Sequence, residues 1–233
     1  MIDLHSHVLP GLDDGAADLE EALAICAAAA ADGIEVLAAT PHVRDDYPTS
    51  PEAMERALEE LRAAAPPVEV VRGAELDLAE LDRPIDELRR YALGGSSYLL
   101  VETPYFGWPL DLADRLFRLR VQGFRAVLAH PERNPDVQEQ PDLLEPIVAA
   151  GTLVQLTGAS VDGRVGGRAR ACARTLLDRR LAHLIASDAH APAIREVGLG
   201  PAVASLKDDV LARWLTLDVP RAVLADVEPP PRP

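Results

Sequence analysis

The stretch Ile2-Asp3-Leu4-His5-Ser6-His7 decides how this sequence is interpreted, because a short apolar run leads directly into two histidines. A run of this kind, ending in polar residues, predicts a short buried β-strand. His5 and His7 are two positions apart on extended backbone, so their side chains point to the same side. Two imidazoles placed in this way can hold one metal ion. We therefore expect the first strand, residues 2–4, to deliver a pair of metal ligands.

Six further apolar runs with strand character follow, each bounded by Gly, Pro or polar turn residues, and amphipathic stretches separate them. The further strands are expected at 35–39, 68–71, 98–101, 126–128, 153–156 and 182–186. The helices are expected at 18–31, 50–65, 84–91, 111–122, 142–150, 167–180 and 202–215. In the second helix, Ser50 is placed as the N-cap with Pro51 at the first helical position. This alternation predicts a parallel sheet with crossover helices.

The spacing of these units favours a closed sheet. Seven strands in 233 residues give about 33 residues per strand, close to one βα repeat of a (β/α)8 barrel. We predict a single α/β domain over residues 1–226, built as a distorted (β/α)7 TIM-like barrel. The Pro-rich tail, 227–233, is expected to be disordered. An open doubly wound sheet is the alternative, but it would normally carry a Gly-rich phosphate loop where His5-Ser6-His7 stands.

The net charge of the protein disfavours some classes of binding partner. Lys and Arg number 23 against 38 Asp and Glu, which gives a formal net charge of −15. Nucleic acids and anionic membrane surfaces repel such a protein, whereas bound divalent cations would offset part of the charge. No apolar run approaches the roughly 18 residues of a membrane span, and the chain opens directly into its first motif. We expect a cytoplasmic enzyme without membrane insertion, and two cysteines are too few for a disulfide framework.

Six of the seven expected strands are followed by a His, Glu or Asp at the C-terminal end, where barrel enzymes build their active sites. These side chains offer imidazole nitrogen and carboxylate oxygen without thiolate, which favours Mn²⁺, Zn²⁺ or Fe²⁺. The candidates are His5, His7, His42, Glu75, Glu102, His130, Asp188 and His190. They exceed the needs of one ion, so two or three ions are expected, with Glu75 as a bridge. His183 lies inside the seventh strand run and is interpreted as structural.

The combined motifs resemble those of a known family. The sequence His5-Ser6-His7-Val8-Leu9-Pro10-Gly11-Leu12-Asp13-Asp14-Gly15 is similar to the opening of the PHP-type bacterial protein tyrosine phosphatases. These enzymes belong to the polymerase-and-histidinol-phosphatase superfamily and act in capsule and exopolysaccharide synthesis. The later motifs match in order over residues 1–190, namely Ala39-Thr40-Pro41-His42, Gly73-Ala74-Glu75, the Glu102 segment, His130-Pro131-Glu132-Arg133 and Ser187-Asp188-Ala189-His190.

The resemblance implies a PHP fold with a trinuclear centre, Mn²⁺ being favoured and Fe or Zn open. The implied ligand sets are His5, His7, Glu75 and Asp188 for the first ion, Glu75, Glu102 and His130 for the second, and Asp14, His42 and His190 for the third. Asp14 could otherwise be a turn residue, as could Asp13. The chain departs from the family at Asn134, where an aromatic residue is common, and in the loop 43–48. Both segments are expected to border the substrate pocket.

Two arginines are candidates for contacting a phosphoryl group. Arg133 follows the ligand His130 by three positions, and its planar donor fork suits phosphoryl oxygens. Arg195 is the second candidate, with a surface ion pair as an equal alternative. His42 or His190 could donate a proton through water, although a tyrosyl leaving group, with a pKa of about 10, needs little help. A cysteine mechanism requires Arg six positions after Cys, and neither Cys26 nor Cys172 meets this spacing.

The favoured hypothesis is a metal-dependent phosphotyrosine-protein phosphatase acting on an autophosphorylated bacterial tyrosine kinase, with its oligomeric state left open. The anionic substrate would require a local positive rim from Arg44, Arg133 and Arg195. One alternative is a small-molecule phosphatase, for example one acting on histidinol phosphate. Another is a metal-stabilised scaffold without catalysis. The scaffold hypothesis predicts missing ligands, whereas every motif position is filled.

Overall fold

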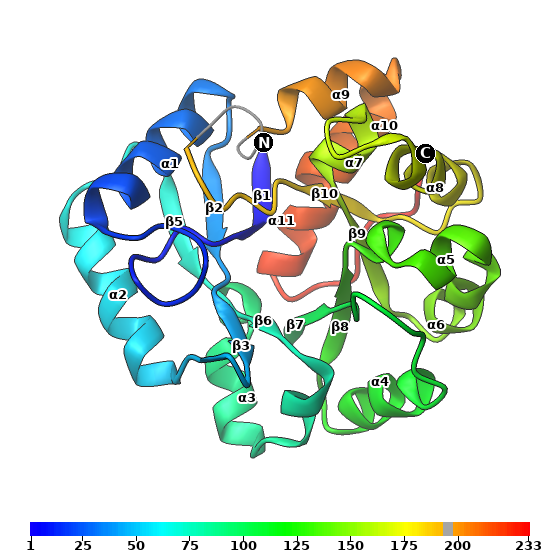
Figure 1. Cartoon of the computed structure of the whole chain (residues 1–233), viewed down its shortest axis with the longest axis horizontal. Helices are drawn as coiled ribbons and strands as arrows, with labels where there is room; N and C mark the ends of the chain where they lie inside the picture. Colours follow the sequence, from blue (N-terminus) through cyan, green and yellow to red (C-terminus); the bar gives the residue numbers. More distant parts are fainter. Residues whose placement is uncertain (193–197) are drawn as a thin grey trace.

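The computed structural model describes residues 1–192 and 198–233, in which strands occupy the centre and helices surround them (Figure 1). The main strands are β1 (Ile2–Ser6), β2 (Val36–Ala39), β5 (Glu69–Arg72), β7 (Tyr98–Glu102), β8 (Arg125–Ala129), β9 (Leu153–Thr157) and β10 (Leu184–Ala186). They correspond to the seven predicted strands, because each buried apolar run forms a strand within two residues of its expected ends.

Six of the predicted helices are present. They are α1 (Leu19–Ala31), α2 (Pro51–Ala63), α3 (Ile85–Tyr91), α4 (Leu112–Val121), α6 (Glu145–Ala149) and α8 (Gly167–Asp178). The predicted cap of α2 is confirmed, since the Ser50 hydroxyl accepts a hydrogen bond from Ala53 N at 3.2 Å. The structure also contains elements that were not predicted, namely the helices α5 (Pro135–Glu139), α7 (Gly158–Asp162) and α11 (Val219–Leu224) and the short strands β3 (His42–Arg44), β4 (Tyr47–Pro48) and β6 (Glu75–Leu76).

The prediction of one helix over 202–215 is wrong. The segment forms α9 (Gly200–Leu206), α10 (Asp209–Arg213) and a π-helical turn, η5 (Trp214–Asp218). Lys207 has a φ of 55°, a left-handed conformation that ends α9. The Asp208 carboxylate then accepts hydrogen bonds from Val210 N and Leu211 N and starts a new helix.

The strands are hydrogen-bonded in two ladders, β1-β2-β5 and β10-β9-β8-β7-β6-β3-β4, and every pairing is parallel except β3–β4. Within each ladder the main strands follow chain order, unlike the order of a doubly wound sheet, so that alternative is not formed. β2 and β5 belong to the first ladder, and each is followed after a few residues by a short strand of the second ladder, β3 and β6 respectively. The chain therefore connects the two ladders through these two segments. The result is a distorted seven-stranded barrel.

The predicted closed sheet is not complete, because the first and last strands lie side by side without a continuous ladder between them. An isolated parallel bridge joins Ser6 to Ala189, and Asp188 N donates to His5 O at 2.9 Å. The buried Asp3 carboxylate adds to this seam, since its Oδ1 accepts hydrogen bonds from His5 N at 3.2 Å and Ser187 N at 3.0 Å. The seam therefore brings the two histidine-containing motifs at the ends of the sequence side by side.

The tail, predicted to be disordered, has contacts in the structure. The Trp214 indole donates to Pro230 O at 2.9 Å, and the Tyr98 hydroxyl donates to Val227 O at 3.1 Å. Disorder of 227–233 in solution remains a prediction. Among the described residues, we find no helix with both the length and the apolar character that a membrane span requires.

His183, interpreted from the sequence as structural, packs just before β10. Its Nδ1 accepts a hydrogen bond from Val154 N at 3.1 Å, and its ring centre lies 6.3 Å from that of Trp214. Burial, reinforced by the nearby Arg232 charge, lowers the pKa of His183 to about 4. The imidazole is therefore neutral in the folded protein at neutral pH.

We expect His183 to make the protein less stable in mild acid. The unfolded chain binds a proton at a pKa of about 6.5, well above the folded value of about 4, so folding stability falls as pH drops between these values. The loss approaches about 3 kcal/mol when complete. The test is urea unfolding of the wild type and His183→Gln, both in the presence of chelator. The free energy of unfolding should depend less on pH in the variant. Equal slopes between pH 6.5 and 4 would contradict this assignment.

Candidate metal centre

The nine residues predicted as metal ligands all lie together at the carboxyl ends of the strands, around the mouth of the barrel. They are His5, His7, Asp14, His42, Glu75, Glu102, His130, Asp188 and His190. All are buried except Asp14 and His190, whose side chains are 44% and 26% exposed. The described residues form four overlapping donor groups, in each of which the ligand atoms lie within 4.8 Å of one another.

The deepest part of the cluster contains the two histidines of β1 and the segment that follows it. His5 Nε2 lies 3.2 Å from His7 Nε2, 3.3 Å from Glu75 Oε2 and 3.2 Å from Asp188 Oδ1. His7 Nε2 is likewise 3.3 Å from Asp188 Oδ1 and 3.5 Å from Glu75 Oε2. Four donor atoms from three distant parts of the chain therefore surround one small volume.

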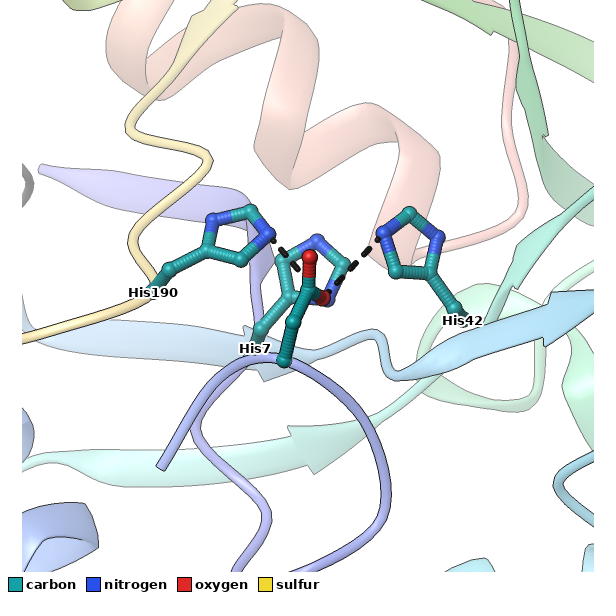
Figure 2. A group of neighbouring side chains, drawn as sticks. His7, His42 and His190 are labelled. Atoms are coloured by element: carbon teal, nitrogen blue, oxygen red, sulfur yellow. Dashed lines mark ion pairs between the residues drawn. The ribbon is translucent and has the colours of Figure 1, made fainter. Parts of the chain in front are cut away.

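A second group lies nearer the solvent and contains His7, Asp14, His42 and His190. Figure 2 shows the three imidazoles side by side, with His7 between His42 and His190. Asp14 Oδ1 is 3.6 Å from His42 Nε2 and 3.5 Å from His190 Nε2. The ring centres of His7 and His190 are 3.9 Å apart. The set inferred for a third ion is thus assembled, with His7 added to it.

The set inferred for the second ion is arranged differently. Glu102 groups with His42 and Glu75, whereas His130 groups with His5 and Asp188. His130 Nε2 still reaches Glu75, lying 2.9 Å from its Oε1. Glu75 therefore connects the two parts of the cluster, in keeping with a bridging position.

The donor set fits divalent cations. Glu75 Oε2 and His42 Nδ1 are buried only 3.0 Å apart, a contact that does not meet hydrogen-bond geometry. The Nδ1 atoms of His5 and His7 face the acceptors Gln155 and Asp13, so in the neutral rings both Nε2 atoms carry lone pairs that meet 3.2 Å apart with no proton between them. Buried polar atoms without partners are costly, and a cation bound between them removes that cost. Nitrogen and oxygen ligands without thiolate suit Mn²⁺, Zn²⁺ or Fe²⁺.

The electrostatics of the cluster also favour added positive charge. Burial opposes a charge on His5, but Glu75 and Asp188 outweigh it and raise the pKa of His5 to about 9. Burial would raise the pKa of Glu75, yet the surrounding imidazoles hold it well below its usual range. The carboxylates thus attract protons to the histidines when no cation is bound. Metal binding should therefore release protons.

Three histidines are oriented by acceptors on the side away from the cluster. The Nδ1–H groups of His5 and His7 donate to Gln155 Oε1 at 3.0 Å and to Asp13 Oδ2 at 2.7 Å. His190 Nδ1–H donates to Asp188 O at 2.9 Å. Each bond leaves the Nε2 lone pair free to face the centre.

Asp13 and Gln155 are two contributors to the site for which no role was predicted. Asp13 also accepts hydrogen bonds from His42 N at 2.9 Å and Gly15 N at 3.0 Å, which ties the loop after β1 to β3. Gly15 is required at its position because a Cβ there would lie 2.0 Å from His7 O. The available signals were a carboxylate in a Gly-flanked turn and an amide near the end of the sixth predicted strand.

Two of the predicted ligands have backbone conformations that are uncommon outside glycine. His130 has a φ of 38° and Asp188 a φ of 57°, both in the left-handed region. They stand just after β8 and β10, where the chain turns out of the barrel. Such conformations cost about 1–2 kcal/mol each and concentrate at functional sites.

Arginines stand beside the carboxylates of the centre. Arg133 Nη1 donates to Asp188 Oδ2 at 2.6 Å, and its guanidinium lies 5.9 Å from the Tyr105 ring centre. Arg44 Nη1 donates to Glu102 Oε1 at 3.1 Å, and its guanidinium lies 5.1 Å from the Tyr47 ring centre. Arg195 falls outside the described residues.

The two cysteines are unsuited to nucleophilic catalysis. Cys26 in α1 and Cys172 in α8 are free and buried. Burial raises the pKa of Cys26 to about 11, and burial together with the Glu132 charge raises that of Cys172 to about 12. Both thiols are therefore protonated at neutral pH, and a thiolate is the form that attacks phosphorus.

Comparisons with known proteins point to one family. The family model described as "Capsular polysaccharide synthesis, CpsB/CapC" matches residues 1–216. Tyrosine-protein phosphatase YwqE of Bacillus subtilis is 33% identical over 196 residues, which cover 82% of this chain and 77% of that protein. Tyrosine-protein phosphatase CpsB of Streptococcus pneumoniae is 25% identical over 241 residues, covering 97% of this chain and 99% of that protein.

Solved structures extend the likeness to the whole chain. One from a study of YwqE from Bacillus subtilis and CpsB from Streptococcus pneumoniae, described as unique metal-dependent tyrosine phosphatases, superposes with a TM-score of 0.90. It is 31% identical and covers 100% of this chain and 99% of its own. A 5-methylcytosine deaminase from Klebsiella pneumoniae, 15% identical, gives a TM-score of 0.55 over 88% of this chain and 62% of its own. That likeness concerns the fold alone.

Proposed function

Because the chain belongs to the CpsB/CapC family of capsular polysaccharide synthesis, we propose that it is a metal-dependent phosphatase that hydrolyses phosphotyrosine in proteins. The observation that carries this proposal is the convergence of nine nitrogen and oxygen ligands beside Arg133 at one end of the barrel. Relatives with solved structures that are described as metal-dependent tyrosine phosphatases support it.

We infer that the centre holds two to three divalent cations, with Mn²⁺ favoured and Fe or Zn as alternatives. The support is the overlap of the four donor groups, since His5, His7, His42 and Glu75 each belong to two of them. Shared donors are suited to neighbouring ions. When bound, such cations polarise the phosphoryl oxygens and make water more acidic.

The chain's own residues contribute binding and orientation. Arg133 is held by Asp188 with a single Nη1 bond, so its other N–H groups remain to bind the phosphoryl oxygens. Asp13 and Gln155 keep His7 and His5 in the tautomer that faces the centre. A phenolate leaves with a pKa of about 10, so proton donation from His42 or His190 through water is a minor contribution.

For the partner, we infer an autophosphorylated bacterial tyrosine kinase of a capsule or exopolysaccharide system. The family description and the names of the relatives support this inference. A cytoplasmic location would suit this partner, and the two free, buried cysteines are in keeping with a reducing compartment.

Steady-state kinetics with Mn²⁺ test the substrate class. We expect kcat/KM to be larger for a phosphotyrosyl peptide than for histidinol phosphate. A preference for histidinol phosphate would favour the small-molecule phosphatase instead. A metal-loaded protein that cleaves no aryl phosphate, and whose His5→Ala variant only melts at a lower temperature, would favour the scaffold hypothesis.

A further inference from the structure

The segment after β7 carries an unusual amount of exposed apolar surface. We call residues 104–110, Pro-Tyr-Phe-Gly-Trp-Pro-Leu, the aromatic loop. Phe106 is 85% exposed and Leu110 100%, the two highest values among the large apolar side chains of the described residues. Exposed apolar side chains gathered in one short segment often mark an interaction site.

The aromatic loop is continuous with the metal centre. It begins two residues after Glu102, a member of one donor group, and Tyr105 lies against the Arg133 guanidinium at 5.9 Å. Arg133 in turn binds Asp188. The exposed side chains therefore stand on the same rim as the arginine that would contact the phosphoryl group.

The loop is held in place from beneath. Asn134 Nδ2 donates to Pro104 O at 2.6 Å and Gly107 O at 3.1 Å, while its Oδ1 caps α5. Trp108 is partly buried and packs against the core. Asn134, the residue that departs from the common family pattern, thus anchors the loop directly beside Arg133. Phe106 and Leu110 are presented outward on an anchored loop.

The residue types of the aromatic loop indicate which kind of partner it can bind. Residues 103–110 contain no charged side chain, although the chain carries a net charge of −15. An anionic phosphopeptide approaching along this segment meets no carboxylate from it, and apolar contact is the interaction that the loop offers. Phe106 and Leu110 are exposed rather than enclosed, so the surface suits an extended chain better than a small molecule held in a pocket.

We infer that the aromatic loop docks the substrate protein by contacting an apolar side chain close in sequence to the phosphotyrosine. This inference rests on the proposed function and deepens it. Phe106 and Leu110 provide the contact surface, and Tyr105 links that surface to the phosphate site. The loop would thereby distinguish a phosphotyrosyl protein from a small phosphate ester.

The double variant Phe106→Ser/Leu110→Ser tests the inference in the Mn²⁺-loaded full chain. We expect kcat/KM for a phosphotyrosyl peptide with a flanking Leu to fall about tenfold, mainly through KM, because truncation of a good apolar contact weakens binding by roughly that factor. The value for p-nitrophenyl phosphate should stay unchanged. A peptide with Ser in place of the Leu should be cleaved equally by wild type and variant.

Phe117→Ser is the matched control, since Phe117 is 62% exposed but lies on α4 outside the loop. It should leave all three substrates unaffected. An unchanged kcat/KM for the Leu peptide in the double variant would overturn the docking surface alone, as would an equal loss on p-nitrophenyl phosphate. A wild-type protein that cleaves neither peptide nor p-nitrophenyl phosphate would overturn the proposed function as well.

Discussion

Treatment with a chelator is expected to lower the phosphatase activity by at least about a thousandfold, because the cations contribute several kcal/mol of transition-state stabilisation. Without them the site retains imidazoles that the carboxylates hold protonated, as the raised pKa of His5, about 9, indicates. Such a site offers positive charge but no Lewis acid. Readdition of Mn²⁺ should restore the rate, which is measured with a phosphotyrosyl peptide.

Glu75→Gln should produce a similar loss that added Mn²⁺ does not reverse, because Glu75 belongs to two donor groups. Glu132→Gln is the matched control. Glu132 is a buried carboxylate whose Oε1 accepts a hydrogen bond from Thr157 N at the end of β9, and it belongs to none of the donor groups found in the described residues. It should keep nearly full activity. Activity that survives exhaustive chelation would contradict the metal centre as the site of hydrolysis.

Replacement of Arg133 by Ala is expected to lower kcat by about 10²- to 10³-fold. Preorganised donors aimed at developing charge commonly contribute this much. Arg133→Lys should recover only part of the rate, because an ammonium lacks the planar fork that binds two phosphoryl oxygens. The measurement is kcat and KM on p-nitrophenyl phosphate, so that contacts with a peptide play no part.

Metal content must be measured in the same variants, since Arg133 binds Asp188 and its loss could disturb a ligand. We expect full metal occupancy in Arg133→Ala. Arg168→Ala serves as the control, because Arg168 lies on α8 with a side chain that is 77% exposed. Unchanged kcat in a fully metal-loaded Arg133→Ala would show that Arg133 does not contact the phosphoryl group.

The barrel strands could be predicted because each is a buried apolar run, and six of the seven are followed by a candidate ligand. β3 and β6 could not be predicted, because strands of three and two residues are too short to show an alternation of apolar and polar side chains. The break at Lys207 was missed for a different reason. A left-handed lysine at the end of a helix is decided by packing and by the Asp208 cap rather than by composition.

That the candidate ligands lie together could be predicted from their residue types and their places at strand ends, but their grouping could not. Whether His130 faces Glu102 or Asp188 depends on how far each strand projects, which only the packed barrel shows. Asp13 and Gln155 were missed because their contribution is a hydrogen bond to the rear of an imidazole. A residue that acts through another leaves little trace in a single sequence.

His130 and Asp188 each have to meet two requirements, a left-handed backbone and a side chain that faces the candidate metal centre. Glycine would relax the main chain at both places, yet it has no side chain to offer a cation. Selection for heat resistance alone would therefore favour substitutions that empty the centre. An engineer seeking a sturdier enzyme should leave these two positions untouched and work on the outer helices instead.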